Sequence, residues 1–354
     1  MSSLKDVANL AQVSLATASR ALSRPETVAT LTRTRVEGAA HQLGYQPNML
    51  ARSLRQRETR TIGLIVADLL NPFHALLAKS VQDTAERHGY VAFLLNSDEQ
   101  EGKESRAIDT LRGHLPQGLI IVPTSGFARR LGSLPRLPVV ELDRVSGAPG
   151  VTTVTVDNVG GARMATQHLI DLGHRDIGMI VGQLDISTAV ERHRGFLETM
   201  RRAGLSYRPD WVLSGHHRED DGHRAARKLL SVPGDRPSAL FVGNNEMTVG
   251  AVLAARDLGL RLPHDLSIVG FDDSRWAQTM FPALTVISQP TEQLGTLACE
   301  HLVRQLAYAH SGNAQLALPA RVLNKAAPIG PVRVQLPTEL IIRHSTSPPA
   351  LVFG

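Results

Sequence analysis

The sequence contains one cysteine, Cys299, in 354 residues. A single thiol excludes an internal disulfide and any multi-cysteine metal site. No motif surrounds Cys299, so we interpret it as a small apolar residue on a helix rather than as a nucleophile. Apolar runs of about 18 residues are also absent, and the segment from Met1 to Asp6 is not typical of a signal peptide. We therefore expect no membrane association and a cytoplasmic protein.

The motifs of common catalytic sites are missing as well. No Gly-x-Gly-x-x-Gly follows a strand-like segment, which argues against a dinucleotide-binding dehydrogenase. No Gly-x-Ser-x-Gly or comparable nucleophile motif occurs. The 14 histidines are scattered and do not have the spacing of metal ligands. We predict that the chain is not an enzyme, binds no metal and needs no cofactor.

Positive charge is concentrated at the N-terminus. Residues 1–60 contain nine Lys and Arg against four Asp and Glu, an excess of five that equals the formal net charge of the whole chain, +5. The remaining residues are therefore electrically balanced. A basic head on a neutral body predicts a polyanion-binding module followed by a separate domain, with a merely solvated arginine-rich tail as the alternative.

The spacing of apolar residues predicts helices within this head. Ser3 and Asp6 form a capping box for a first helix beginning at Leu4. A short turn at residues 12–13 precedes a second helix, capped by Ser14 and running from Leu15 to about residue 22. A third helix spans residues 32–43 and is ended by glycine 44 as a left-handed cap. Two short helices joined by a tight turn, with a third bracing them, predict a helix-turn-helix.

The motifs of this head resemble a known family. LKDVANLAQVSLATASRAL, TRTRV, LGYQPN and ARSLR stand in the order and spacing of the lactose/galactose repressor (LacI/GalR) family, and the similarity continues through GFDD and LPTELIIRHST. The resemblance implies a sequence-specific DNA-binding transcription regulator, with repression as its expected effect. It also implies that the helix from Leu15 lies in the major groove of double-stranded DNA, with Leu15, Ala16 and Arg20 facing the bases.

The chemistry of these residues suits those roles. Leucine and alanine can contact thymine methyl groups, and Arg20 can form a fork with guanine. Thr17, Ser19 and the backbone amides near Ser14 are suited to phosphate, which positions the helix without specifying a sequence. The alternative is that Leu15 and Ala16 belong to the core of the head.

Residues 48–55 resemble the hinge helix of the same family. In that family two such helices, one from each subunit, enter the minor groove. The resemblance places Asn48 among the DNA contacts, Ala51 at the contact between paired helices, Leu54 as an apolar wedge between bases and Arg55 along the groove. A helix this short is marginal alone, so its folding would depend on DNA and a partner subunit. We expect a homodimer, or a higher oligomer, on an inverted-repeat operator, with a plain linker as the alternative.

From residue 61 the pattern alternates between strands and helices. Strand-like runs recur near residues 61–67, 91–95, 118–122, 138–142, 177–181, 239–242 and 266–270. The expected fold is a small all-α helix-turn-helix head plus an α/β body like that of periplasmic binding proteins, with two doubly wound parallel-sheet lobes and a ligand cleft between them. The expected domains are 1–47 for DNA binding, 48–60 for the hinge and linker, and 61–354 for effector binding and dimerisation.

Ligands of such folds bind at the carboxyl ends of strands. Polar residues at these positions resemble those of the repressors and of periplasmic ribose-binding proteins, and they suit sugar hydroxyls, with Phe73 facing the ring carbons. The alternatives are a turn at Asn71, a loop cap or Arg144 contact for Asp143, a turn at Asn244 and Asn245, and an exposed loop at His217. The expected effector-binding residues are Asn71, Phe73, His74, Asp143, Arg144, Arg192, His217, Asn244, Asp272 and Gln289.

The expected effector is a small carbohydrate. His74 and His217 occupy positions that are aromatic in similar proteins, and an imidazole adds a charge that can appear near pH 6 to 7. We therefore expect a sugar acid, bound more tightly as the pH falls. A solute-binding protein and a sugar-modifying α/β enzyme are the alternatives, and the basic head and missing catalytic motifs argue against them. On DNA the protein would be nucleoid-associated. The long segment at residues 311–332 departs from the family pattern and has no functional account.

Overall fold

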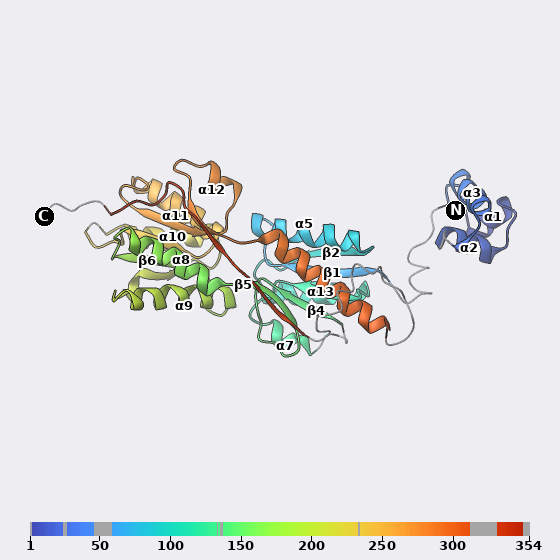
Figure 1. Cartoon of the computed structure of the whole chain (residues 1–354), viewed down its shortest axis with the longest axis horizontal. Coiled ribbons are helices and arrows are strands. Elements are labelled where there is room, and N and C mark those ends of the chain that lie inside the picture. The colour runs from blue at the N-terminus through green and yellow to red at the C-terminus, as the bar shows by residue number, and fades with distance from the viewer. Residues whose placement is uncertain are drawn as a thin grey trace. The chain divides into compact units, whose positions relative to one another are not determined.

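The computed structural model describes residues 2–23, 27–45, 59–132, 134, 137–232, 234–311 and 331–349. The chain divides into two compact units, Met1–Thr59 and Arg60–Gly354 (Figure 1). Each unit has its own hydrophobic core, as the switch from a basic helical head to a strand-rich body predicts. No helix in the described part of the chain combines the length and apolar character needed to cross a bilayer.

The first unit contains α1 (Leu4–Leu10), α2 (Leu15–Ser23) and α3 (Thr30–Gln42). The predicted capping box is present, because Ser3 Oγ accepts a hydrogen bond from the amide of Asp6 at 3.3 Å and the Asp6 carboxylate accepts one from the amide of Ser3 at 2.8 Å. Small side chains from all three helices pack together, with Val7, Ala18 and Val36 fully buried. The helix-turn-helix prediction is confirmed, although α3 begins two residues earlier than expected.

The first lobe of the second unit, called the N-lobe here, is a parallel six-stranded sheet with the order β11-β5-β4-β3-β1-β2. Helices α5 and α13 cover one face, where the larger core lies, and α6 and α7 cover the other. Its elements are β1 (Thr61–Val66), α5 (Pro72–Arg87), β2 (Val91–Asn96), α6 (Glu101–Gly113), β3 (Gly118–Ile121), α7 (Phe127–Leu131), β4 (Val139–Leu142), β5 (Thr152–Val156), α13 (Thr291–Ser311) and β11 (Arg333–Leu336).

The C-lobe repeats this topology. Its sheet has the order β12-β10-β9-β8-β6-β7, and every pairing is parallel except that of β10 with β12. Helices α10 and α11 cover one face, and α8 and α9 the other. Its elements are α8 (Asn158–Asp171), β6 (Ile177–Val181), α9 (Ser187–Arg202), the 3-10 helix η2 (Pro209–Trp211), β7 (Val212–Ser214), α10 (Glu219–Leu230), β8 (Ala239–Val242), α11 (Asn245–Asp257), β9 (Ser267–Phe271), α12 (Arg275–Thr279), β10 (Thr285–Ser288) and β12 (Glu339–Ile341).

The two lobes are interleaved along the chain. The polypeptide passes from one lobe to the other after β5, after β10 and after β11, as the long red segment in Figure 1 shows for the last passage. The expected fold of two doubly wound lobes is confirmed. In each lobe the first strand lies between the second and the third, so the order of connections reverses beside it, and ligands of such sheets bind at the carboxyl ends of the strands.

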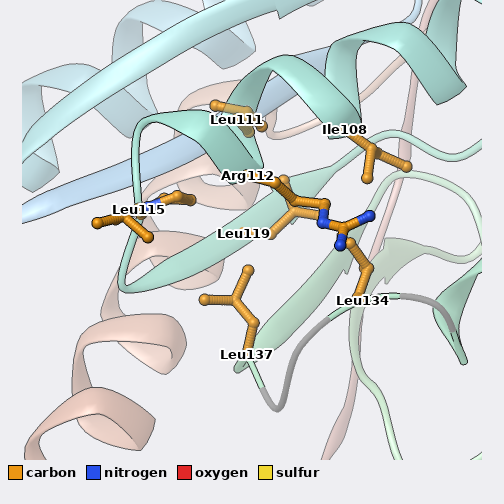
Figure 2. Close-up of a pocket in the computed structure, with 8 residues that line it drawn as sticks. Ile108, Leu111, Arg112, Leu115, Leu119, Leu134 and Leu137 are labelled. Atoms are coloured by element: carbon orange, nitrogen blue, oxygen red, sulfur yellow. The ribbon is translucent and has the colours of Figure 1, made fainter.

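An apolar cavity of about 220 Å³ lies in the N-lobe at the opposite, amino end of β3. Figure 2 shows the leucine side chains around it, with the guanidinium of Arg112 among them. The cavity is a gap in packing between the end of α6 and the segment that precedes β4. It is lined by Ile108, Leu111, Arg112, Leu115, Pro116, Leu119, Leu134 and Leu137.

Candidate functional site

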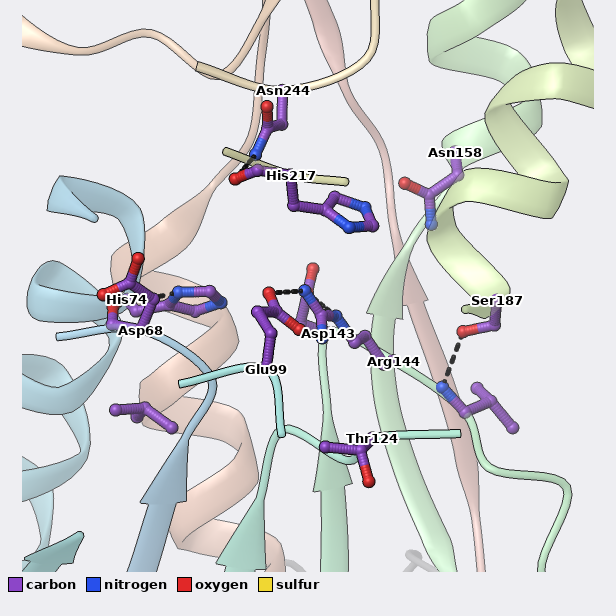
Figure 3. A network of polar contacts seen from close by, with 12 residues as sticks. Asp68, His74, Glu99, Thr124, Asp143, Arg144, Asn158, Ser187, His217 and Asn244 are labelled. Atoms are coloured by element: carbon purple, nitrogen blue, oxygen red, sulfur yellow. Dashed lines mark hydrogen bonds and ion pairs between the residues drawn. The ribbon is translucent and has the colours of Figure 1, made fainter. Parts of the chain in front are cut away.

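Polar side chains from both lobes come together at the carboxyl ends of the strands. All ten residues that the sequence predicts for effector binding are buried. Figure 3 shows His74, Asp143 and Arg144 entering from the N-lobe, and His217 and Asn244 from the C-lobe. Asp272 follows β9 and Gln289 follows β10, while Arg192 comes from the middle of α9. The arrangement is a buried polar cluster that both lobes build.

Several of these residues have an unusual backbone conformation. Asp143, His217 and Asp272 have positive φ angles of 68°, 59° and 78°. Glu99, which follows β2, has a φ of 59°. Residues other than glycine rarely adopt this left-handed conformation, and it is concentrated at binding and active sites where the surrounding structure enforces it. The strand ends of both lobes are therefore shaped to point these side chains inward.

A buried ion pair lies on the N-lobe side of the cluster. Arg144 Nη1 and Nη2 donate to the two carboxylate oxygens of Glu99, each at 2.6 Å, and the two side chains are 5% and 9% exposed. Burial raises the pKa of Glu99, but the charge and hydrogen bonds of Arg144 outweigh it and bring that pKa to about 2. Burial also raises the pKa of Asp143 to about 6, against the opposing effect of Arg144. Glu99 was not among the predicted residues.

Arg192 and Asp272 occupy the C-lobe side. Arg192 Nε donates to Asn158 Oδ1 at 2.9 Å, Nη1 donates to the carbonyl of Gly243 at 2.6 Å, and the guanidinium lies 3.6 Å from the centre of the Phe271 ring. Asp272, the next residue, accepts hydrogen bonds from Gln289 and from the backbone amide of Asn245. Burial raises the pKa of Asp272, and the charge of Arg192 opposes that rise. Both side chains are thus held in fixed orientations by the protein.

The two histidines are buried and neutral. Burial, together with the positive charge of Arg144, lowers the pKa of His74 to about 4 and that of His217 to about 3. The expectation that they become charged near pH 6 to 7 is therefore wrong. The sequence could not show that both imidazoles would be enclosed beside an arginine. Without that charge, the argument for an anionic ligand loses the part that depends on the histidines.

An amide pair joins the two lobes. The side chains of Asn71 and Asn245 donate to each other, with N–O distances of 3.1 and 2.9 Å. Asn71 Oδ1 also accepts from the amide of Phe73 and thereby caps α5, so the helix begins at Pro72. Asn244 caps α11 through Met247 and donates to the carbonyl of His217. The amide oxygen of each residue and one N–H of each amide group form hydrogen bonds within the protein.

Phe73 lies beside His74 at the start of α5. Its side chain is part of the N-lobe core, and its ring stands edge-on to the imidazole of His74 with 5.3 Å between the ring centres. The ring therefore supports His74 from behind. His217 is held by close contact with Gly182, since a Cβ at that glycine would lie 2.0 Å from its Nε2 atom.

Four polar atoms in the cluster lack a hydrogen-bond partner within the described chain. They are Asp143 Oδ1, Arg144 Nε, His217 Nδ1 and Gln289 Oε1. A buried polar atom without a partner costs about 1 to 3 kcal/mol, so native proteins rarely leave several together. Two of the four are acceptors, one is a donor, and the imidazole nitrogen can be either. Both donor and acceptor groups are thus left without a hydrogen bond in this cluster.

The predicted DNA-contacting residues of the head lie on one exposed part of α2 and its N-terminus. Leu15 is 52% exposed, and Ser14, Ala16 and Arg20 are also exposed, while Thr17 and Ser19 are half-buried. Ser14 Oγ accepts from the amide of Thr17 at 3.1 Å and caps α2. The alternative that Leu15 and Ala16 are core residues is therefore wrong. Four further predicted contacts lie outside the described residues: Asn48, Ala51, Leu54 and Arg55.

Comparison with known families decides what kind of protein this is. Residues 3–48 match the bacterial regulatory proteins of the lacI family. Residues 59–326 match the periplasmic binding proteins and sugar binding domain of LacI family. The chain belongs to the LacI family. This LacI-family chain is 35% identical over 310 residues to the HTH-type transcriptional repressor PurR of Serratia proteamaculans, an alignment that covers 86% of this chain and 91% of that protein.

Solved structures agree with this assignment. The LacI-family chain superposes with a TM-score of 0.81 on the lac repressor dimer bound to operator and the anti-inducer ONPF, at 25% identity and covering 98% and 99% of the two chains. It matches the transcriptional regulator CelR–cellobiose complex with a TM-score of 0.68 and 31% identity, covering 98% of this chain and 100% of that one. This LacI-family chain is a sequence-specific DNA-binding transcription regulator and not an enzyme.

Three residues of the cluster were not predicted from the sequence as site residues. Glu99 follows a predicted strand, so the rule that singled out the other strand ends would have found it. Asn158 follows β5, which the sequence analysis did not predict. Asn245 stood beside Asn244 as an equal turn candidate, and only the structure shows which amide reaches the other lobe. Among the residues described here, no group of His, Cys, Asp and Glu is arranged to hold a metal ion.

Proposed function

We propose that this protein is a dimeric repressor of an inverted-repeat operator, and that a small neutral carbohydrate binds its buried polar cluster and changes its affinity for DNA. The observation that carries the effector assignment is the set of four buried atoms without hydrogen-bond partners in the described chain. A sugar hydroxyl both donates and accepts, so neighbouring hydroxyls can satisfy Asp143 Oδ1, Arg144 Nε, His217 Nδ1 and Gln289 Oε1 together. The bound cellobiose in the CelR complex is a neutral sugar of this kind.

The residues of the cluster take different roles in this proposal. We assign Asp143, Arg144, Arg192, His217, Asp272 and Gln289 to direct effector contact, with His74 presenting a flat neutral face. Asn71 and Asn244, by contrast, cap helices, and Asn71 also joins the lobes through Asn245. Phe73 acts through His74. These assignments replace direct ligand contact for Asn71, Phe73 and Asn244.

A thermal-shift screen of the full-length protein tests the effector assignment. A ligand that binds the folded state raises the unfolding free energy by RT ln(1 + [L]/Kd), which is about 2.7 kcal/mol at a concentration of 100 Kd. The screen contains neutral mono- and disaccharides and the matching sugar acids. At least one neutral sugar should raise the melting temperature in a concentration-dependent way. Stabilisation by sugar acids alone would contradict the neutral assignment, and no stabilisation by any sugar would contradict the carbohydrate effector.

The DNA assignment rests on the exposed face of α2. We propose that Leu15, Ala16 and Arg20 contact base edges in the major groove, and that Ser14, Thr17 and Ser19 hold phosphate. One such helix per chain reads one half-site, so a dimer requires an inverted repeat. The lac repressor, a dimer on its operator in the matched structure, provides the precedent. The hinge residues Asn48, Ala51, Leu54 and Arg55 complete the proposed interface, with Leu54 as the wedge.

Footprinting on the DNA upstream of the gene and its neighbours tests this interface. We expect protection of a symmetric site by a dimer, with an affinity that falls steeply as salt rises. Arg20→Ala should reduce operator binding by about 1 to 3 kcal/mol while changing non-specific binding less. Leu54→Ala should likewise weaken operator binding more than non-specific binding. A single asymmetric half-site protected by a monomer would contradict the dimer, and equal losses on both kinds of DNA would contradict base contact.

The proposed DNA-binding and effector-binding roles divide the chain into three parts. We propose residues 1–47 as the DNA-binding domain, 48–60 as the hinge and linker, and 61–354 as the effector-binding and dimerisation domain. We propose that the protein acts in the cytoplasm and associates with the nucleoid while bound to its operator. Effector and operator must affect each other's affinity by the same factor, so calorimetry with and without operator DNA tests the coupling.

A further inference from the structure

The charge balance of the polar cluster points to a residue that selects the effector. Three carboxylates, Glu99, Asp143 and Asp272, face two guanidinium groups, Arg144 and Arg192, and all five side chains are buried or nearly so. The two imidazoles of the cluster are neutral. With these three carboxylates ionised, the five side chains carry one more negative than positive charge before any ligand enters. A buried excess of one sign favours a ligand that does not add to it.

Glu99 is responsible for this excess. Its two carboxylate oxygens accept hydrogen bonds from both terminal nitrogens of Arg144, at 2.6 Å each. This is the fork geometry in which an arginine can also bind the carboxylate of a ligand. Arg144 Nε lies 3.7 Å from Asp143 Oδ2 and is the guanidinium nitrogen that lacks a hydrogen-bond partner in the described chain. One N–H suits a single hydroxyl oxygen. Glu99 thus neutralises the arginine and also occupies its anion-binding face.

The position of Glu99 makes this role specific to the site. It follows β2 with a left-handed φ of 59°, which turns its side chain toward the carboxyl end of β4, where Arg144 lies. In Figure 3 the Glu99 carboxylate lies between His74 and Arg144, in the space where the side chains of both lobes meet. The other buried glutamate of this lobe that pairs with an arginine, Glu104, bonds to Arg130 and Thr124 instead.

We propose that Glu99 is a specificity-determining residue that makes the effector site select neutral over anionic carbohydrates by occupying Arg144. This inference rests on the proposed carbohydrate effector and goes beyond it, because it names the residue that sets the preferred charge. Removing the carboxylate charge would free both terminal nitrogens of Arg144 and bring the charges of the cluster into balance. An anionic sugar could then form the fork that Glu99 forms now.

Calorimetry on the full-length protein tests this role. The probes are matched pairs, D-glucose with D-glucuronate and D-galactose with D-galacturonate, at pH 7.5, where Asp143 with a pKa of about 6 is ionised. The wild type should bind the neutral member of a pair at least about tenfold more tightly. In Glu99→Gln the ratio of the affinity for the neutral sugar to the affinity for its acid should fall by at least about tenfold, or invert. Glu99→Asp keeps the charge and should preserve this ratio. Glu104→Gln is the matched control and should leave the ratio unchanged.

A double variant keeps the test decisive if the lone Glu99→Gln variant does not fold. Glu99→Gln with Arg144→Gln removes the whole ion pair, leaves no unpaired guanidinium and keeps the excess negative charge, so the preference for the neutral sugar should persist. Each of three results would overturn the inference. They are tighter binding of the acids than of the neutral sugars by the wild type, an unchanged ratio of the two affinities in folded Glu99→Gln, and tighter binding of the acids by the double variant. If the wild type binds neutral sugars but Glu99→Gln keeps its ratio, only the role of Glu99 fails. Binding of no neutral sugar contradicts the proposed function and this inference with it.

Discussion

Protonation of His217 in the unfolded chain is expected to lower the stability of the protein in acid. The His217→Gln variant should not show this part of the decrease. The His217 side chain is buried, and its folded pKa is lowered from 6.5 to about 3, first by burial and then by the charge of Arg144. In the unfolded chain the histidine titrates near 6.5. Between these values the unfolded state binds a proton that the folded state does not. The stability that the neutral imidazole contributes is therefore present above pH 6.5 and is lost as the pH falls toward 3.

The size of the effect follows from the two pKa values. At pH 5, protonation of the unfolded histidine favours unfolding by RT ln(1 + 10^1.5), which is about 2 kcal/mol. For a folding unit the size of one lobe this corresponds to a change of about 4 to 8 °C in melting temperature. Titration of other groups, such as Asp143 with its pKa raised by burial to about 6, contributes to both proteins and largely cancels in the difference.

Thermal unfolding of the full-length wild type and the His217→Gln variant at pH 8 and pH 5 measures this quantity. The difference in melting temperature between the two proteins should shift in favour of the variant at pH 5. His216→Gln is the matched control, because it removes a neighbouring imidazole whose side chain is 51% exposed. If the difference between wild type and His217→Gln is the same at both pH values, the imidazole is not buried and neutral, and our view of the cluster is wrong.

Three further perturbations test other parts of the structure. A double-mutant cycle of Asn71→Ala and Asn245→Ala should give a coupling energy of about 1 to 3 kcal/mol in urea unfolding, from two reciprocal hydrogen bonds; additive effects would contradict the bridge between the lobes. Asp272→Asn should abolish the effector response in an operator-release assay and keep operator affinity within about tenfold, whereas a retained response would exclude Asp272 from the effector site. Leu137→Phe should fill the N-lobe cavity of about 220 Å³ and stabilise the protein by about 0.5 to 2 kcal/mol; destabilisation would show that the cavity cannot accept the ring.

Local features of the sequence were enough to predict much of this protein. The capping box at Ser3 and Asp6 and the turn before Leu15 depend on residues only a few positions apart, so they are readable without a fold. The alternation of strands and helices predicted the two lobes, and the rule that ligands bind at strand ends predicted which residues become buried together. Arg192 was the exception, since it comes from the middle of α9 and was identified through the family pattern.

What those buried residues do was decided only by the tertiary structure. Asn71 and Asn245 are 174 positions apart, and Glu99 and Arg144 are 45 apart, so no local pattern links either pair. The pKa of His217 depends on how completely neighbouring elements exclude water and on the arginine they bring beside it. The sequence determined which side chains stand at the strand ends. Folding decided which bond to each other and which atoms stay unsatisfied for a ligand, because hydrogen-bond partners and desolvation are properties of the packed arrangement.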